Sequence, residues 1–119
     1  MIKPQDLRVN NYVQAKSPEM HEYQSPVKID KYYLELFLNG GLDVKPIPIT
    51  EEILNRDKFK NVWPGFTLQT DDIEICLVCP HDDWYLFIGD WRRKLKGFHH
   101  LQNIVYDLTG IELTLKHDA

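Results

Sequence analysis

The chain has 119 residues, of which 43% are hydrophobic and 12% aromatic, and its formal net charge is −4. This length fits one domain with its own core, and the apolar content excludes global disorder. The acidic balance disfavours nucleic-acid binding through bulk charge, although a local basic patch stays open. Two cysteines make no disulfide framework, and no stretch has the character of a signal peptide or a membrane span. We therefore expect a cytoplasmic protein without a membrane segment.

The N-terminal part of the chain predicts a small β-structure that follows a short turn over Lys3–Arg8. The predicted strands are Val9–Ala15, Pro26–Asp30, Tyr32–Leu38 and Leu42–Ile47. Apolar side chains alternate in the third of these, and Asn39-Gly40 directly after it is a strong hairpin signal because both residues tolerate positive φ. We expect these strands, over about residues 1–49, to form a small, partly open barrel of SH3-like type.

The following part predicts a helix and then a three-stranded antiparallel sheet. Thr50 is suited to cap the helix, and Glu51 and Glu52 in its first turn complement the helix dipole. The three predicted strands are Phe66–Gln69, Ile73–Cys79 and Trp84–Gly89. We expect a turn over Asn61–Gly65 and a loop over Gly89–Gly97.

A C-terminal helix is predicted from Phe98 to Leu108. Five apolar residues fall within one arc of about 120°, the width of a buried helical stripe: Phe98, Leu101, Ile104, Val105 and Leu108. Gly110 would end the helix, and Ile111–Leu113 would leave it as a short strand. The stripe predicts that Leu101, Ile104 and Leu108 are inaccessible and that Asn103 and Asp107 are exposed.

These elements predict an α+β fold in a single domain over residues 1–119. The SH3-like, partly open barrel would be followed by the helix, the three-stranded sheet and the C-terminal helix that packs on it, over about residues 50–119.

Three segments of the chain carry a resemblance. They are Asp6–Val13 (DLRVNNYV), Pro46–Leu54 (PIPITEEIL), and His100–Asn103 (HLQN) together with Leu108–Leu113 (LTGIEL). In these segments the chain resembles a group of short proteins of unknown function from prophage-like and mobile regions of gut bacterial genomes. The shared segments are scaffold features, so the resemblance implies no activity, ligand or catalytic residue. The group has glycine near the position of Asn10 and before Phe59, where this chain has Asn10 and Lys58.

Residues with possible metal or acid–base chemistry are few. Cys76-Leu77-Val78-Cys79, followed by His81, would supply zinc ligands, but residues three apart on a strand point to opposite faces. His99 and His100 are adjacent and lack the i, i+4 spacing of helical metal ligands, so they predict a solvated face. The acidic pairs Asp71-Asp72 and Asp82-Asp83 are typical of turns. We therefore predict no catalytic, cofactor-binding or metal-binding residue, and a protein that is not an enzyme.

The basic segment Trp91–Lys96 is the one candidate site. A tryptophan beside arginines suits a protein–protein hot spot, and it equally suits stacking on a base beside phosphate. The third interpretation is a basic loop with Trp91 in the core. Because the net charge of −4 weakens the nucleic-acid case, we favour a protein partner or self-association through Trp91, Arg92 and Arg93. The predicted function is a non-enzymatic binding or accessory module of mobile-element type; the alternative is a small nucleic-acid-binding accessory protein that uses Trp91–Lys96.

Overall fold

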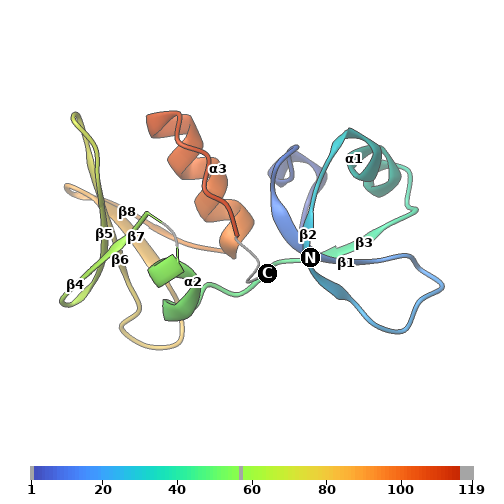
Figure 1. Ribbon diagram of the computed structural model, residues 1–119, viewed down its shortest axis with the longest axis horizontal. Helices are drawn as coiled ribbons and strands as arrows, with labels where there is room; N and C mark the ends of the chain where they lie inside the picture. Colours follow the sequence, from blue (N-terminus) through green and yellow to red (C-terminus); the bar gives the residue numbers. More distant parts are fainter. Residues whose placement is uncertain (1, 57, 116–119) are drawn as a thin grey trace. The chain divides into compact units, whose positions relative to one another are not determined.

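The computed structural model describes residues 2–56 and 58–115 of the chain (Figure 1). The described residues form three α-helices and two antiparallel sheets, so the predicted α+β class is confirmed. They divide into two compact units. The first unit runs to Pro48 and includes Lys96–Ile104; the second runs over Ile49–Leu95 and includes the described residues from Val105 to Leu115. A single domain over the whole chain stays a prediction.

The first unit is built on a three-stranded sheet whose central strand is β1. Its elements are the 3-10 turn η1 (Pro4–Asp6), β1 (Tyr12–Lys16), β2 (Gln24–Lys28), α1 (Lys31–Leu38) and β3 (Asp43–Lys45). β1 pairs antiparallel with β2 on one side and with β3 on the other. Val13 and Ala15 on β1 are buried while their neighbours are half-buried, as expected for a strand that covers a core with one face. Asn10 before this strand has φ 79°, a conformation that glycine adopts most readily.

Helix α1 corrects the prediction of a strand over Tyr32–Leu38 and of a hairpin at Asn39-Gly40. The side chain of Asp30 accepts a hydrogen bond of 2.8 Å from the backbone N–H of Tyr33, which caps the helix at its start. In so short an apolar run, alternation and helical spacing fit the same residues equally well. Since this segment is a helix, the described residues form no closed barrel.

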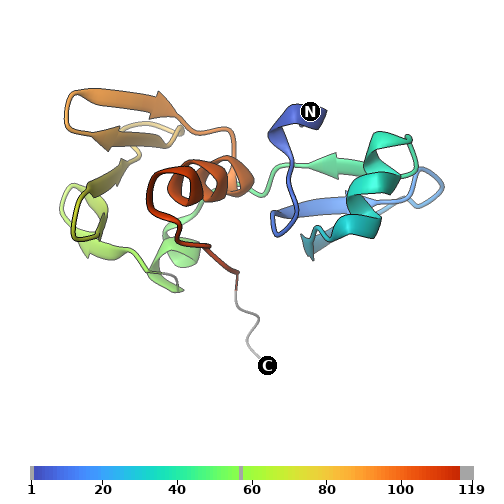
Figure 2. The same ribbon diagram turned by 90° about the horizontal axis from the view of Figure 1, so that it is seen from above.

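The second unit contains a five-stranded antiparallel sheet in which the strands follow their sequence order (Figure 2). The strands are β4 (Lys60–Val62), β5 (Gly65–Gln69), β6 (Glu74–Val78), β7 (Tyr85–Ile88) and β8 (Trp91–Lys94). The three predicted strands correspond to β5, β6 and β7; the prediction of only three is wrong. Both additional strands lie at the edges, and all their side chains are exposed, so neither shows the alternation by which a half-buried strand is recognised.

Helix α2 (Glu51–Arg56) begins where the sequence predicted it. The backbone N–H of Ile53 donates a 3.2 Å hydrogen bond to Oγ1 of Thr50, which confirms Thr50 as the cap. Leu54 in this helix is fully buried.

Helix α3 (Phe98–Thr109) confirms the predicted C-terminal helix and its end. Gly110 has φ 75°, and its N–H donates to the carbonyl of Tyr106. Leu101 is buried and Asp107 is exposed, as predicted, but Ile104 and Asn103 are half-buried and Leu108 is 47% exposed. The buried side chains of the helix include the polar His99 and Gln102, so its buried face is rotated relative to the predicted apolar stripe. Residues after Gly110 form no strand within the described part, although Leu113 is fully buried.

Candidate functional site

The predicted site residues lie on β8, the last strand of the five-stranded sheet. A two-residue turn of Gly89 (φ 56°) and Asp90 joins β7 to β8, and Ile88 faces Trp91 across it. The predicted loop is therefore wrong, and so is the interpretation with Trp91 in the core, because Trp91 is 43% exposed. We refer to Trp91–Lys94 and its unpaired side as the β8 edge.

Side chains of the β8 edge alternate between the two faces of the sheet. Trp91 and Arg93 share one face, and the guanidinium carbon of Arg93 lies 5.4 Å from the ring centroid of Trp91, within the range of a cation–π contact. Arg92 and Lys94 share the other face. The ammonium of Lys94 lies 3.3 Å from Oδ2 of Asp83, but both side chains are more than half exposed, so this ion pair adds little stability.

The backbone of the β8 edge has hydrogen-bonding groups directed away from the sheet. The N–H of Leu95, just beyond β8, donates to the carbonyl of Trp84 at 2.9 Å. Hydrogen-bonded and non-hydrogen-bonded pairs alternate along an antiparallel ladder, so Trp91 and Arg93 also bond to β7. The N–H and C=O groups of Arg92 and Lys94 consequently point outward, about 7 Å apart along the strand.

Two aromatic residues beside this edge were not among the predicted site residues. Phe87 on β7 lies directly opposite Arg92, and Tyr85 lies opposite Lys94. Both rings are half-buried, whereas Leu86 between them is fully buried, so the rings lie on the less covered face of the sheet. Alternation of Tyr85 and Phe87 with Leu86 was the signal available in the sequence.

A second exposed tryptophan lies in the turn at the opposite edge of the sheet. Trp63, which joins β4 to β5, is 91% exposed, and the adjacent Val62 is 54% exposed. The turn itself was predicted, but nothing in the sequence distinguished this tryptophan from a core residue.

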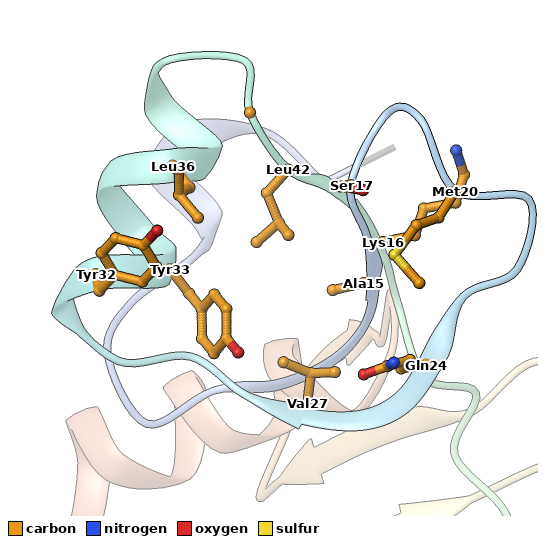
Figure 3. Close-up of a pocket in the computed structure, with 11 residues that line it drawn as sticks. Ala15, Lys16, Ser17, Met20, Gln24, Val27, Tyr32, Tyr33, Leu36 and Leu42 are labelled. Atoms are coloured by element: carbon orange, nitrogen blue, oxygen red, sulfur yellow. The ribbon is translucent and has the colours of Figure 1, made fainter.

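The first unit contains a cavity of about 270 Å³, which was not predicted from the sequence (Figure 3). It lies between β1, β2 and α1, with apolar side chains around its interior. The lining residues include Ala15, Val27, Tyr33, Leu36 and Leu42.

Cys76 and Cys79 are both free thiols, and they bond to different groups. Cys76, on β6, donates to Oε1 of Glu74 at 3.4 Å, while Cys79, beyond the strand, donates to the carbonyl of His81 at 3.1 Å. Burial raises the pKa of each thiol above 9.0, and nearby carboxylates add to the effect. Within residues 2–56 and 58–115, no three His, Cys, Asp or Glu side chains gather as a metal site would require. The absence of bound metal stays a prediction.

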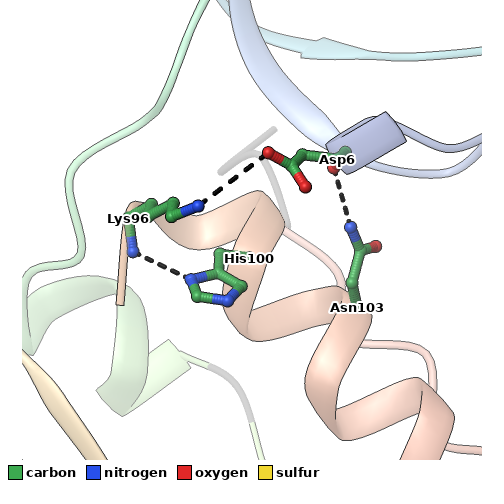
Figure 4. Close-up of polar contacts among 4 residues, drawn as sticks. All are labelled: Asp6, Lys96, His100 and Asn103. Atoms are coloured by element: carbon green, nitrogen blue, oxygen red, sulfur yellow. Dashed lines mark hydrogen bonds and ion pairs between the residues drawn. The ribbon is translucent and has the colours of Figure 1, made fainter. Parts of the chain in front are cut away.

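The histidine pair does not lie on a solvated face, as the sequence suggested. His99 is 2% exposed, and burial lowers its pKa from 6.5 to about 4. The next histidine along the chain, His100, is half-buried, and its Nδ1 accepts a hydrogen bond of 3.0 Å from the backbone N–H of Lys96 (Figure 4). The ammonium of Lys96 is 3.9 Å from Oδ2 of Asp6, and Asn103 donates to the carbonyl of Asp6 at 2.9 Å. These contacts fasten η1 to the first turns of α3, which is a structural role.

None of the helices within the described ranges has the length and hydrophobicity of a transmembrane span. No protein-family model, curated protein or solved structure matches the chain. The candidate site is therefore supported by its geometry alone.

Proposed function

We propose that the protein is a non-enzymatic binding module that takes an extended, acidic segment of another polypeptide as an additional strand beside β8. The outward N–H and C=O groups of Arg92 and Lys94 on an exposed edge strand carry this proposal. A strand added at such an edge gains main-chain hydrogen bonds, and its alternate side chains meet those of the edge strand.

The charge of the β8 edge selects the partner. Arg92 and Lys94 are cations on one face and Arg93 is a cation on the other, so an acidic strand would meet positive charge on both faces. Arginine can bind a carboxylate through two parallel hydrogen bonds. A second copy of the chain, docked through the same strand, would place like charges directly opposite one another, which is destabilising. The favoured partner is therefore a different polypeptide.

Trp91 supplies the apolar contact. At 43% exposure it can bury further area against a partner, and tryptophan and arginine are the residues most enriched in hot spots. The stacked guanidinium of Arg93 holds a cation beside the ring.

Single-stranded nucleic acid is the alternative partner. The half-exposed rings of Tyr85 and Phe87, directly opposite Lys94 and Arg92, favour it because aromatic rings beside cations stack on bases and meet phosphate. The net charge of −4 weakens this alternative.

Three further hypotheses rest on the sequence. They are a partly open, SH3-like barrel for the first unit, a cytoplasmic location, and an origin in prophage-type mobile elements.

Calorimetric titration with three peptides tests the proposal. The acidic probe is Thr-Glu-Val-Glu-Val-Glu-Thr with blocked ends, and the controls carry Gln or Lys in place of Glu. We expect the acidic peptide to bind, and Trp91→Ala or Arg92→Ala to weaken it about tenfold or more. Lys60→Ala, on the opposite edge strand, is the matched variant that should leave binding unchanged.

Two results would decide against this function. If the Lys peptide bound as tightly as the acidic peptide, the charge of the β8 edge would not select the partner. If Lys60→Ala weakened binding as much as Trp91→Ala, the peptide would not bind at the β8 edge. If none of the three peptides bound, and a ten-residue oligothymidylate bound and was released by added salt, the nucleic-acid alternative would be established.

A further inference from the structure

The cavity of the first unit is too large for a packing defect and too small for a drug-sized ligand. Its volume is about 270 Å³, whereas a dry cavity of roughly 150 Å³ already accepts benzene. Binding pockets for larger ligands begin near 300 Å³. The space therefore suits one ring with a few attached atoms.

Its interior is continuous with the hydrophobic core of the unit. Ala15 and Leu42 are buried core residues, and Val27, Tyr33 and Leu36 pack against that core. Two lining residues are small: Gly41 has no side chain, and Ala15 carries two methyl groups fewer than Val13, two residues earlier on the same face of β1. The open space thus lies where the sequence places a small residue instead of one that would fill it.

The opening is lined by residues suited to an aromatic guest. Tyr32 and Tyr33 of α1 are tilted against each other with ring centroids 5.9 Å apart. Tyr32 is 64% exposed, and the thioether side chain of Met20 is 43% exposed. Aromatic rings favour edge-to-face contacts with other rings, and thioether sulfur makes favourable contacts with ring edges.

The polar groups of the cavity are neutral or already compensated. Its one charged lining residue, Lys16, lies 3.2 Å from Oδ2 of Asp43 and 5.4 Å from the ring centroid of Tyr23. The Tyr33 ring points into the cavity, with its hydroxyl on the side of Val27 and Gln24 (Figure 3). That hydroxyl has no hydrogen-bond partner among the described residues, so it can bond to a guest.

From these observations we infer that the cavity binds a single, uncharged aromatic ring that carries one hydrogen-bonding group. The ring is held between Tyr32, Tyr33, Leu36 and Leu42, and its polar group meets the Tyr33 hydroxyl. A free small aromatic molecule and an aromatic side chain of a partner polypeptide share this chemistry. This site is independent of the β8 edge, because all its lining residues belong to the first unit.

Protein-observed NMR with the full chain tests the inference. Indole and benzyl alcohol are the probes, and benzoate and benzylammonium are their charged counterparts. We expect the neutral probes to shift the amide resonances of Ala15, Val27 and Leu42, with dissociation constants of about 1 mM or tighter. Tyr33→Phe should weaken benzyl alcohol about fivefold and leave the fold intact.

Filling the cavity should abolish binding. Ala15→Leu is expected to keep or raise the melting temperature and to remove the shifts; Leu36→Phe is the second filling variant if Ala15→Leu does not fold. Lys28→Ala, exposed on β2 and outside the lining, should bind like the wild type. The absence of shifts at these residues with millimolar probes, equal binding of the charged compounds, or undiminished binding by the filled variants would overturn the inference. Acetyl-tryptophan amide bound in preference to indole would assign the site to a partner's side chain.

Discussion

The backbone N–H of Tyr12 donates a hydrogen bond of 2.8 Å to Oε1 of Gln102, ninety residues further along the chain. Gln102 is fully buried, and its Nε2 donates in turn to the carbonyl of Asn10 at 3.0 Å. One side-chain amide thus satisfies two backbone groups at the start of β1. Asn11, also fully buried, donates to Oδ1 of Asn103 at 2.8 Å beside it. A buried amide of this kind fixes which segment of the chain lies against α3.

The first prediction concerns this amide. Gln102→Leu removes the acceptor of the Tyr12 N–H and the donor to the Asn10 carbonyl without leaving a large void. Because buried backbone groups would be left without partners, unfolding should become easier by about 2–4 kcal/mol in urea titrations. Asp107→Ala, on an exposed position of the same helix, should cost under about 0.5 kcal/mol. Equal midpoints for the two variants would show that the amide contributes nothing.

The second prediction separates two leucines of α3. Leu101 is fully buried, so Leu101→Ala should cost about 2–5 kcal/mol. Leu108 is 47% exposed, so Leu108→Ala should cost less than about 1 kcal/mol, although the sequence assigned both leucines to one buried stripe. Thermal denaturation compares them, and a larger loss for Leu108→Ala would contradict the burial of the helix.

Two tryptophans of the second unit provide the third prediction. Trp84 is half-buried and its ring centroid lies 6.0 Å from that of Phe66, so Trp84→Ala should lower the melting temperature markedly. Trp91→Ala should melt near the wild type because its ring stands on an exposed edge strand. If Trp91→Ala unfolds the protein instead, the ring is part of the hydrophobic core and is not an apolar contact for a partner at the β8 edge.

His99 gives the fourth prediction, a dependence of stability on pH. Burial lowers the pKa of His99 to about 4 in the folded state, while in the unfolded chain it lies near 6.5. The unfolded state therefore binds more protons between these two pKa values. The contribution of His99 to the free energy of unfolding is fully present above pH 6.5 and is lost as the pH decreases toward 4. The loss amounts to about 3 kcal/mol.

Comparison of variants isolates this contribution from that of the carboxylates. His99→Leu cannot titrate and should flatten the stability profile between pH 4 and 6.5 by about that amount. His21→Gln, at an exposed position between β1 and β2, is the matched replacement of a histidine. An unchanged slope in His99→Leu would mean that His99 is protonated in the folded state.

The elements predictable from sequence are those with a local signal. Thr50 before two glutamates located α2, and the apolar spacing with Gly110 located α3 and its end. Helix α1 was mistaken for a strand because its eight residues satisfy both periodicities, and the choice is made by the Asp30 cap and by packing of Tyr33 and Phe37 on the core. The packing contacts leave no periodic mark in the sequence, whereas the cap residue Asp30 was a local signal for a helix.

The amino-acid composition of the segment located the candidate site, whereas its structure depends on the topology of the sheet. A tryptophan beside basic residues identified Trp91–Lys94 as a candidate site. That this segment is a strand depends on its pairing with β7, and a strand whose side chains are all exposed has no hydrophobic pattern that would predict it. The outward amides of Arg92 and Lys94 likewise follow from register alone. The cavity in the first unit depends on α1 and was therefore invisible once that segment was predicted as a strand.

Amide hydrogen exchange along β8 tests the central claim most directly. In the free protein, the amides of Trp91 and Arg93 should be protected by β7, while those of Arg92 and Lys94 should exchange rapidly. On saturation with the acidic peptide, the amides of Arg92 and Lys94 should become protected, because each would donate to the added strand. Binding that leaves these two amides exchanging as fast as in the free protein would contradict the addition of a strand at the β8 edge.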